Sequence, residues 1–515
     1  MSRDRLLAEA HEHYRVGALD EARATCQRML QASPADAGAL TLMAAIAADE
    51  RKTEEGMRWA TSAAAADAAA PGPHYVMGRL CQDDGRLAEA EAHYRRALSL
   101  KPDHAKAHNN LGAVLQMQGQ LQAAVESYRR ALVLDPSLPQ ANQNLASILR
   151  DGSAAEKAIA GFQRLLEENP RDAKAHTDLA NVYRELGRHR DAIASYGRAI
   201  TCDPDLAEAH FARGIELLLC GDYEQGWREY EWRWRVRAFS SPMRALREPA
   251  WNGERLAGGT ILLHAEQGFG DTLQLVRYAA SVAERCQAVV VECQPQLKRL
   301  LAATPGVTSV HAQGEPLPRF DAHLPMMSLP GVFGTTLQTV PWTGAYVRPP
   351  ADAPRVISSP GPNIGLVWAG EPRQGDDRKR SLTLELLAPL KDTLGATFYS
   401  LQKGAGAAQA ATPPAGMRFV DLGPHIDDFA DTAAFIAQLD LVITVDTSVA
   451  NLAGAMAAPT WVLLSTVPDW RYQLEGDATP WYPTMRLFRQ TRDGDWPEVI
   501  ARAAQALRST SKPFR

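Results

Sequence analysis

The sequence predicts a chain of two parts: an array of helical hairpins, followed by an α/β region with two parallel sheets. Three observations carry this prediction. In the first half, prolines recur every 34 residues, at Pro102, Pro136, Pro170 and Pro204. Columns of small and aromatic residues keep the same period, which indicates a repeated structural unit. After Trp251 the period ends, and short apolar runs alternate with amphipathic stretches, as they do in βα units.

Each repeat column has a physical explanation. One column holds small residues where two helices touch, and another holds an aromatic residue near the end of the second helix. The small column is Gly78, Gly112, Ala146, Ala180 and Gly214; the aromatic column is Tyr94, Tyr128, Phe162, Tyr196 and Tyr230; a third column is Ala90, Ala124, Ala158 and Ala192. Gly119 marks the turn between the helices of one unit. About seven units fit into residues 1–237, and the unit resembles the tetratricopeptide repeat, which stacks into a superhelix.

The last unit departs from this pattern and ends in a segment rich in Arg and Trp, residues 227–251. A net charge of −5 argues against a surface that binds nucleic acid phosphates. We therefore interpret this segment as a structural junction. Its aromatic side chains would be buried, and its arginines would pair with Glu229, Glu231 and Glu248.

Composition and cysteine usage predict a large cytoplasmic protein. With 515 residues, 45% of them hydrophobic, the chain has material for the repeats and one or two further cores. The six cysteines form no CxxC pair and no metal-ligand spacing, so we expect reduced core thiols. The N-terminus lacks the apolar core of a signal peptide, and no apolar stretch of about 18 residues exists, so we expect neither secretion nor a membrane span.

The second half contains two series of predicted strands and helices. Strands of the first series are expected at residues 259–265, 288–293, 308–312 and 320–325, with helices at 271–285 and 296–305. A proline-rich interval at residues 349–362 follows. Strands of the second series are expected at residues 363–370, 396–402, 417–423, 441–446 and 460–465, with helices at 382–394, 428–439 and 449–457. This order predicts two parallel-sheet domains with a cleft between them, where loops at the carboxyl ends of the strands carry the chemistry.

The first loop of interest is the glycine-rich turn after the first predicted strand. Gly268 and Gly270 match the start of a dinucleotide fingerprint, and Glu292 closes the next strand, where a ribose-binding acid would lie. However, Leu273 replaces the third glycine, and Asp271 puts a carboxylate where a pyrophosphate would be repelled. These departures argue against a dinucleotide enzyme. Two roles are left for Asp271, a helix cap or a catalytic group.

The second loop follows the predicted strand that ends at Asp446. Thr447 and Ser448 come next, before a helix of small residues, so backbone N–H groups and hydroxyls gather at a helix N-terminus. This pattern is typical of a phosphate cradle, and the alternative is an ordinary helix cap. Nearby basic residues support the interpretation as a phosphate cradle. The alternative is that this run of charged residues is an ordinary solvated loop. The basic residues are Arg378, Lys379, Arg380 and Lys403.

At these loops the chain resembles a known family. The segments GFGDTLQLVRY and ITVDTSVANLAGA are similar to the heptosyltransferase-type glycosyltransferases, which carry a Gly-Asp motif in one domain and a Val-Asp-Thr motif at the donor diphosphate in the other. With the repeats in front, the chain resembles the bacterial tetratricopeptide-repeat glycosyltransferases, similar in architecture to the O-linked N-acetylglucosamine transferases. The resemblance implies a GT-B fold of two Rossmann-like domains that face a cleft. The parts would be a repeat array at 1–237, a junction at 238–257, an N-terminal half at 258–350 and a nucleotide-sugar-binding half at 351–515.

The resemblance also implies roles for individual residues. The Gly-Asp aspartate, a proposed general base in the family, falls on Asp271. The Val-Asp-Thr residues fall on Asp446 and Thr447, and the N–H groups of Ser448 and Val449 would face the donor diphosphate. Further donor-binding candidates are Arg380, Gln402, Lys403 and Asn451. Many relatives have a histidine at the position of Asn451, and an amide donates a hydrogen bond but does not titrate.

The repeats carry a column that suggests an acceptor site. Asn110, Asn144 and Asp178 stand 34 residues apart on the first helices of successive units, and Val76 and Ala212 end the column. Amide side chains on such a face can pair with an extended peptide backbone. The O-linked N-acetylglucosamine transferases have an asparagine ladder at the same place in the unit. The alternative is a solvated polar column.

These observations predict a glycosyltransferase that acts without a cofactor or a metal ion on a protein acceptor held by the repeats. Asp271 would accept the proton of the acceptor hydroxyl, and basic groups with the helix start at Thr447 would stabilise the leaving diphosphate. Flagellin or another surface protein is the acceptor that family analogy suggests. Two alternatives stay open: a repeat scaffold with a non-catalytic GT-B-like domain, and a transferase for a saccharide or a lipid-linked glycan. The sequence predicts no nucleic acid partner.

Overall fold

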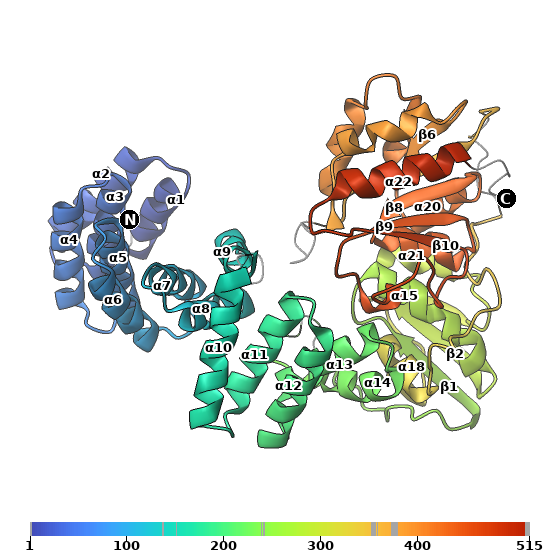
Figure 1. Ribbon diagram of the computed structural model, residues 1–515, viewed down its shortest axis with the longest axis horizontal. Coiled ribbons are helices and arrows are strands. Elements are labelled where there is room, and N and C mark those ends of the chain that lie inside the picture. Colours follow the sequence, from blue (N-terminus) through green and yellow to red (C-terminus); the bar gives the residue numbers. More distant parts are fainter. Residues whose placement is uncertain are drawn as a thin grey trace. The chain divides into compact units, whose positions relative to one another are not determined.

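The computed structural model describes residues 3–135, 138–150, 152–237, 239, 241, 243–351, 357, 359–371 and 380–509. Pro136, Arg378 and Lys379 lie outside these residues. The chain divides into two compact units, residues 1–186 and 187–515, and each is described by itself (Figure 1). Within the described residues, no helix is both long and apolar enough to cross a membrane.

The first unit is built from helices that pack as antiparallel hairpins. They are α1 (Arg3–Arg15), α2 (Leu19–Ala32), α3 (Ala37–Asp49), α4 (Thr53–Ala66), α5 (Pro71–Asp83), α6 (Leu87–Leu100), α7 (Ala105–Met117), α8 (Leu121–Leu134), α9 (Pro139–Arg150), α10 (Gly152–Glu168) and α11 (Ala173–Glu185). Figure 1 shows neighbouring hairpins stacked side by side. The helical array predicted from the period of 34 residues is confirmed.

The repeat columns pack as their residue types predict. A Cβ atom on Gly78 would lie 2.7 Å from the Tyr94 ring, and a Cβ atom on Gly112 would lie 2.7 Å from the Tyr128 ring. The small residue is therefore required because the aromatic ring of the second helix fills that space. Both tyrosines are fully buried. Gly119 has a φ of 77°, which allows the tight turn between α7 and α8.

The second unit begins with the last helices of the array. They are α12 (His189–Cys202), α13 (Ala207–Leu219) and α14 (Tyr223–Tyr230), followed by the 3-10 turn η1 (Glu231–Arg235). Trp227 is buried and donates from Nε1 to the Thr335 carbonyl (3.2 Å). Tyr230 and Trp251 are buried as well, whereas Trp232 and Trp234 are half-buried, so the aromatic part of the junction is core packing in part.

One of the predicted junction pairs is present: Arg233 pairs with Glu231 (2.8 Å). Glu229 pairs instead with Arg213, which lies outside the junction segment (2.9 Å). Glu248 has no ion pair within the described residues. Arg233 instead extends to Glu266 (3.0 Å), a residue outside the predicted junction segment.

The first sheet has four parallel strands in the order β3-β2-β1-β4. They are β1 (Leu256–His264), β2 (Cys286–Cys293), β3 (Ser309–Ala312) and β4 (Ala322–Pro325). The helices between them are α15 (Phe269–Leu275), α16 (Ala279–Ala283), α17 (Lys298–Leu301) and α18 (Leu329–Val332). Each predicted strand is present, but the helix predicted at 271–285 is broken by a 3-10 turn, Val276–Tyr278.

The second sheet has six parallel strands in the order β10-β9-β8-β5-β6-β7. They are β5 (Asn363–Val367), β6 (Thr397–Ser400), β7 (Phe419–Asp421), β8 (Leu441–Val445), β9 (Thr460–Leu464) and β10 (Met485–Arg489). Its helices are α20 (Phe429–Ile436), α21 (Ser448–Ala455) and α22 (Trp496–Ser509). In both sheets the carboxyl ends of the strands lie on one edge, so the loops that follow β1 and β8 are in a position to line a site.

Several details differ from the sequence predictions. The helix predicted at 382–394 is a 3-10 segment at Leu384–Asp392, because Pro389 cannot continue an α-helix. Strand β10 and helix α22 were not predicted. The six cysteines are free, but Cys220 is exposed and is therefore not a core thiol.

Candidate functional site

A cleft of about 1060 Å³ lies at the carboxyl ends of the strands. Three parts of the second unit line it. The last helices of the array contribute Phe211, Ile215 and Tyr230. The first sheet contributes residues 267–271 after β1 and Gln294 and Gln296 after β2. The second sheet contributes residues of the segments after β5, β6, β7, β8 and β9. Of the predicted site residues on the α/β region, all line this cleft: Asp271, Arg380, Gln402, Lys403, Asp446, Thr447, Ser448, Val449 and Asn451.

Asp271 lies in the first turn of α15, and both of its carboxylate oxygens are engaged. Oδ2 accepts a hydrogen bond from the N–H of Gly268 (2.9 Å), so the side chain caps the helix start. Oδ1 forms an ion pair with Nη2 of Arg471, which comes from the second sheet domain. The helix-cap role that the sequence left open is therefore present.

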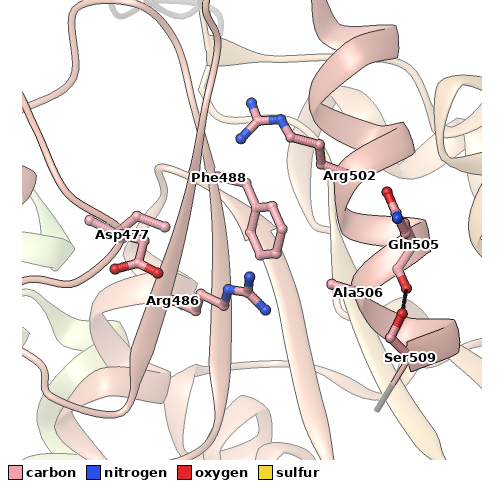
Figure 2. Close-up of a pocket in the computed structure, with 8 residues that line it drawn as sticks. Asp477, Arg486, Phe488, Arg502, Gln505, Ala506 and Ser509 are labelled. Carbon is pink, nitrogen blue, oxygen red and sulfur yellow. Dashed lines mark hydrogen bonds between the residues drawn. The ribbon is translucent and has the colours of Figure 1, made fainter.

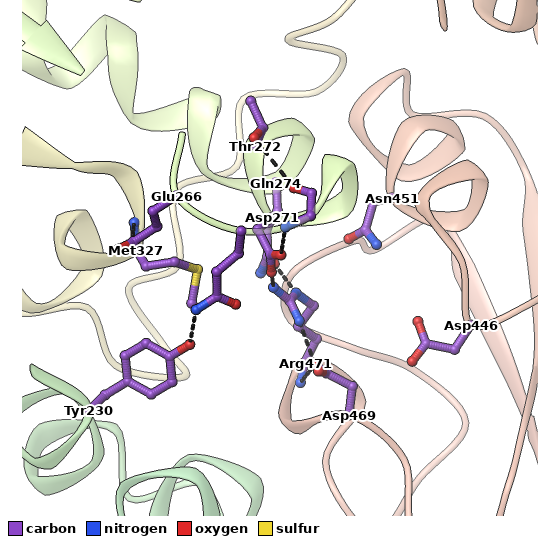
Figure 3. A network of polar contacts seen from close by, with 12 residues as sticks. Tyr230, Glu266, Asp271, Thr272, Gln274, Met327, Asp446, Asn451, Asp469 and Arg471 are labelled. Carbon is purple, nitrogen blue, oxygen red and sulfur yellow. Dashed lines mark hydrogen bonds and ion pairs between the residues drawn. The ribbon is translucent and has the colours of Figure 1, made fainter. Parts of the chain in front are cut away.

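Arg471 joins the two halves of the cleft from a buried position. Its Nη1 pairs with Asp469 (2.8 Å), its Nε donates to Gln274, and its Cζ lies 4.4 Å from the centre of the Trp470 ring. Figure 3 shows this network, with Asp271 and Gln274 on one side and Asp469 on the other. The neighbouring carboxylates raise the pKa of Arg471 well above its ordinary value against the opposing effect of burial, so the guanidinium is charged.

Asp446 follows β8 directly and lies on the opposite side of this network (Figure 3). Its Oδ1 accepts a hydrogen bond from the Tyr472 hydroxyl (3.2 Å). Burial, with a further contribution from the negative charge of Asp469, raises the pKa of Asp446 to about 6. Arg380 and Arg471 oppose this rise. Asp446 therefore changes its charge near neutral pH.

Helix α21 starts at this point with its first-turn N–H groups uncapped. Thr447 is the N-cap residue, but its side chain accepts no hydrogen bond from the helix; its hydroxyl instead shares a hydrogen bond with Thr444 (3.0 Å). Ser448 and Val449 line the cleft. Free N–H groups at a helix start attract anions, because they add to the positive end of the helix dipole.

Asn451 lies in the first turns of α21, and its amide has two hydrogen-bond partners. Its Nδ2 donates to the Thr447 carbonyl (3.3 Å), and its Oδ1 accepts from the buried Tyr482 hydroxyl (2.9 Å). A Cβ atom on Gly270 would lie 2.8 Å from Nδ2 of Asn451. Gly270 is therefore required by the close approach of α15 to α21. The amide of Asn451 is used in packing, and this gives a structural reason for its presence.

Two donor-binding candidates have contacts that point to a bracing role. The Oε1 of Gln402 accepts from the N–H groups of Trp368 (3.0 Å) and Ala369 (2.9 Å), and its Nε2 donates to the carbonyls of Ala369 (2.9 Å) and Lys403 (2.7 Å). Nζ of Lys403 donates to the carbonyls of Gly423 (3.0 Å) and Ile426 (2.8 Å). Both side chains therefore fix the loop after β6, and their role in donor binding stays a prediction.

The wall of the cleft from the last helices of the array is apolar. Phe211 and Ile215 of α13 are half-buried, and the Phe211 ring lies 5.3 Å from that of Tyr230. The Tyr230 hydroxyl accepts a hydrogen bond from Nε2 of Gln267 (2.7 Å), which ties this wall to the turn that carries Asp271. The cleft therefore has an apolar side on the array and a charged side on the loops around the start of α21.

Sequence reasoning missed the charged centre of the cleft. Asp469, Arg471 and Tyr472 lie in an aromatic segment that showed no motif, and no short-range pattern connects them with Asp271 or Asp446. The available signal was an Asp-Trp-Arg-Tyr run just after a predicted strand end, the place where site residues gather in parallel sheets.

The predicted acceptor column lies on the first helices of hairpins in the first unit. Nδ2 of Asn110 donates to the hydroxyls of Tyr75 (3.3 Å) and Tyr94 (3.4 Å). Nδ2 of Asn144 donates to Oδ1 of Asn109 (3.2 Å), which in turn donates from Nδ2 to Asn110 (3.1 Å). The two asparagines of the column are thus linked through Asn109, a residue that the sequence analysis did not single out.

Asp178 has a different environment. It pairs with Lys174 (3.3 Å), and Lys174 also lies 3.5 Å from Glu126. This end of the column is charged, whereas the end at Asn110 is neutral.

Within the described part of the chain, no cluster of His, Cys, Asp or Glu has the arrangement of a metal site. A second hollow of about 600 Å³ lies between β10 and α22 and contains none of the predicted site residues (Figure 2). Its lining includes Asp477, Arg486 and Arg502. The Arg486 guanidinium lies over the Phe488 ring (4.8 Å), and Arg502 pairs with Glu498 (2.5 Å), so these side chains have structural partners.

Comparison with protein families identifies tetratricopeptide repeats in the first half. Residues 75–139 and 162–194 match models of the tetratricopeptide repeat, and residues 180–215 match a further TPR repeat model. The repeats inferred from the sequence are therefore confirmed. Such repeats are protein-interaction modules, and a role of this chain as a scaffold for protein partners is supported.

One curated relative is Protein FlbA of Caulobacter vibrioides, which is 27% identical over 328 residues, 58% of this chain and 54% of FlbA. The chain thus matches about half the length of that relative. Solved structures with similarity include YrrB, described as a TPR protein with an unusual peptide-binding site (20% identity, 36% of this chain, 97% of YrrB, TM-score 0.24). Another is pilF of Pseudomonas aeruginosa (17% identity, 40% of this chain, 94% of pilF, TM-score 0.28).

Proposed function

We propose that the chain is a glycosyltransferase of the GT-B type that moves a sugar from a nucleotide sugar to a protein acceptor recruited by the repeats. The observation that best supports this proposal is the charged side of the cleft. There, uncapped N–H groups of α21 lie beside two aspartates from different sheet domains, Asp271 and Asp446. Glycosyl transfer needs such a pair of features, an anion cradle for the leaving diphosphate and a carboxylate for the acceptor proton.

The positive groups for the donor would be the helix start at Ser448 and Val449 together with Arg380. Arg380 lines the cleft, and its charge already acts on Asp446. Positive charge and N–H groups stabilise the diphosphate as it leaves, because negative charge develops on its bridging oxygen. The proposal assigns these roles to protein groups and includes no metal ion.

The acceptor would be a polypeptide, because the chain carries repeats of a kind that commonly binds proteins and the last helices of the array form a wall of the cleft. The apolar side chains of Phe211 and Ile215 favour an acceptor with an apolar residue near its hydroxyl group. A saccharide acceptor would find few polar partners on this wall.

A second candidate function is a repeat scaffold whose α/β region binds a nucleotide without turning it over. The contacts of Asn451 favour it: where many members of the resembled family have an imidazole, this amide is bonded to the Thr447 carbonyl and the Tyr482 hydroxyl and does not titrate. Turnover separates the two functions, because only the transferase releases a nucleoside diphosphate.

A donor screen tests the proposed function directly. The full chain is heated with UDP-, GDP-, CMP- and ADP-linked sugars, and at least one is expected to raise the melting temperature, since a ligand that binds only the folded state stabilises it. Release of the free nucleotide in the presence of candidate proteins, with mass spectrometry of those proteins, then measures transfer. No thermal shift and no turnover with the whole panel would contradict the proposal.

The helix cradle makes a sharper prediction at Ser448. Proline is tolerated at the first helical position, so Ser448→Pro is expected to keep α21 and to remove one N–H group from the cleft. One hydrogen bond to a charged group contributes about 1.5–3 kcal/mol, so donor affinity should fall by roughly ten- to a hundredfold. Ser448→Ala, which keeps the N–H group, is the matched control. Calorimetric titration with the stabilising nucleotide sugar measures both, and equal affinities would refute the cradle.

The acceptor column makes a prediction of its own. The double variant Asn110→Ala, Asn144→Ala removes two amides that are linked through Asn109 and is expected to weaken binding of an acceptor peptide by about tenfold or more. Asp178→Ala, at the charged end of the column, is the comparison variant. Fluorescence anisotropy with a labelled peptide from an identified acceptor measures the loss, and unchanged affinity in the double variant would assign the column to packing.

A further inference from the structure

Asp271 and Asp446 are the predicted aspartates of the cleft, and their carboxylates are held differently. Asp469, which also lines the cleft, accepts at Oδ1 from the N–H and Nη1 of Arg471. The Asp271 carboxylate is occupied at both oxygens, by the Gly268 N–H and by Arg471. The Asp446 carboxylate accepts one hydrogen bond at Oδ1, from Tyr472. Within the residues that the structure describes, Oδ2 of Asp446 has no hydrogen-bond partner, and the residue lines the cleft.

We infer that Asp446 is the proton acceptor of the proposed transfer reaction and that Asp271 acts instead as a positioning residue, which ties the two halves of the cleft together through Arg471. This inference rests on the proposed function. It reverses the roles that the family resemblance implies, in which Asp271 is the base and Asp446 belongs to the donor site.

The position of Asp446 suits the reaction. It stands two residues before Ser448, the first residue of α21, so it lies next to the N–H groups that would hold the diphosphate. The sugar carbon that reacts is joined to that diphosphate. In the transfer, the acceptor hydroxyl gives its proton to Asp446 Oδ2 while its oxygen forms the bond to this carbon. The bond from the carbon to the diphosphate breaks at the same time, and the nucleoside diphosphate leaves with the electron pair.

The groups that face Asp446 support this role. Asp469 is a neighbouring negative charge, Arg380 and Arg471 are positive charges, and Tyr472 donates a hydrogen bond. Their combined effect with burial is a pKa of about 6, and a general base works best when its pKa is near the working pH. Asp271, in contrast, would have to break an ion pair and release its helix cap before it could take a proton.

The test compares Asp446→Asn with Asp271→Asn in the full chain. Asn at position 446 still accepts a hydrogen bond from Tyr472 but takes no proton, so turnover of the stabilising nucleotide sugar should fall by about a hundred- to ten-thousandfold. Donor affinity should change by less than about tenfold. In the wild type, kcat should rise as pH increases through about 6, because Asp446 then loses its proton. In Asp271→Asn, kcat should show the same rise near pH 6, even if the variant is slower and less stable.

A second measurement needs no substrate. The folded state holds the proton of Asp446 more tightly than the unfolded chain does, so the stability that this neutral carboxyl contributes is lost as pH rises from about 4 to about 6. Asp446→Asn stays neutral throughout, so its melting temperature should exceed that of the wild type at pH 8 by about 3–6 °C and match it closely near pH 4.

The outcomes separate the two proposals. If the wild-type chain turns over no nucleotide sugar of the panel, the proposed function fails and this inference fails with it. If the wild type is active and Asp446→Asn keeps its rate, or if Asp271→Asn loses the limb near pH 6, only the assignment of Asp446 is overturned.

Discussion

Replacing Arg471 by alanine is expected to lower the free energy of unfolding of the second unit by about 3–5 kcal/mol, the usual cost of removing one partner from a buried ion pair. The side chain is buried and contacts three partners, Asp271, Asp469 and Gln274. Its loss leaves two carboxylates without their counter-charge in a partly enclosed cleft. It also removes the ion pair between Arg471 and Asp271 of the first sheet domain, so the two halves should separate more easily.

Urea unfolding followed by tryptophan fluorescence measures this loss, because Trp470 lies directly against the Arg471 guanidinium. Arg471→Lys is the matched control: it keeps the charge, but a single ammonium group does not reproduce the planar fork that reaches three partners. We therefore expect the lysine variant to lie between the alanine variant and the wild type. A loss below about 1 kcal/mol in the alanine variant would mean that the network is solvated and does not hold the halves together.

A comparable loss, about 3–5 kcal/mol, is expected for Arg233→Ala at the end of the helical array. Arg233 is fully buried and pairs with Glu266 (3.0 Å), and it also donates to the Ser328 hydroxyl (2.9 Å). Glu266 follows β1, so this arginine connects the last helices of the array to the first sheet. Without it, Glu266 is left buried with a hydrogen bond from the N–H of Met327 (3.0 Å).

The loss at Arg233 should depend on pH. Burial raises the pKa of Glu266 to about 7, and the Arg233 charge is the largest influence that opposes this rise. In Arg233→Ala the pKa should rise further, so the carboxyl is neutral at pH 5 and its unpaired charge is costly only at higher pH. The destabilisation should therefore be larger at pH 8 than at pH 5.

Thermal unfolding at the two pH values measures this difference. The double variant Arg233→Met, Glu266→Gln replaces the charged pair by neutral groups of similar size, and Gln keeps an acceptor for the Met327 N–H. It should recover most of the lost stability. Equal losses at pH 5 and pH 8, or no recovery in the double variant, would show that packing and not charge pairing sets the role of Arg233.

The roles that we propose for the two aspartates illustrate what a motif predicts and what it does not. The Gly-Asp motif predicted correctly that Asp271 would lie at the start of a helix in the cleft. The motif contains no information on the partners of the carboxylate, and these partners decide whether it is free to take a proton. Its ion-pair partner, Arg471, stands 200 residues away in the sequence.

The start of α21, which we propose as the donor cradle, likewise combines features that the sequence predicts with contacts that it does not. The order of β8, Asp446 and a helix of small residues predicted the uncapped start of α21, because local chain direction alone aims its N–H groups at the strand ends. The bracing contacts of Gln402 and Lys403 were not predictable, since they depend on which backbone carbonyls surround each side chain after folding. The segment Leu384–Asp392 was predicted as an α-helix but is a 3-10 helix. Its apolar spacing suits both geometries, and Pro389 is the residue that disfavours the α-helix.

The sequence by itself determined the features that depend on neighbours along the chain: the helical hairpins with their period of 34 residues, the order of parallel strands, and the two loops that would line a cleft. Periodic burial and turn residues are local properties, so one sequence is enough to read them. Only the tertiary structure decided how the cleft is charged. It placed Asp469, Arg471 and Tyr472 between Asp271 and Asp446 and put Phe211 and Ile215 on the facing wall. The bond between Asp271 and Arg471 joins residues 200 positions apart. Such contacts arise when packed cores bring distant segments together, and no periodic pattern in the sequence predicts them.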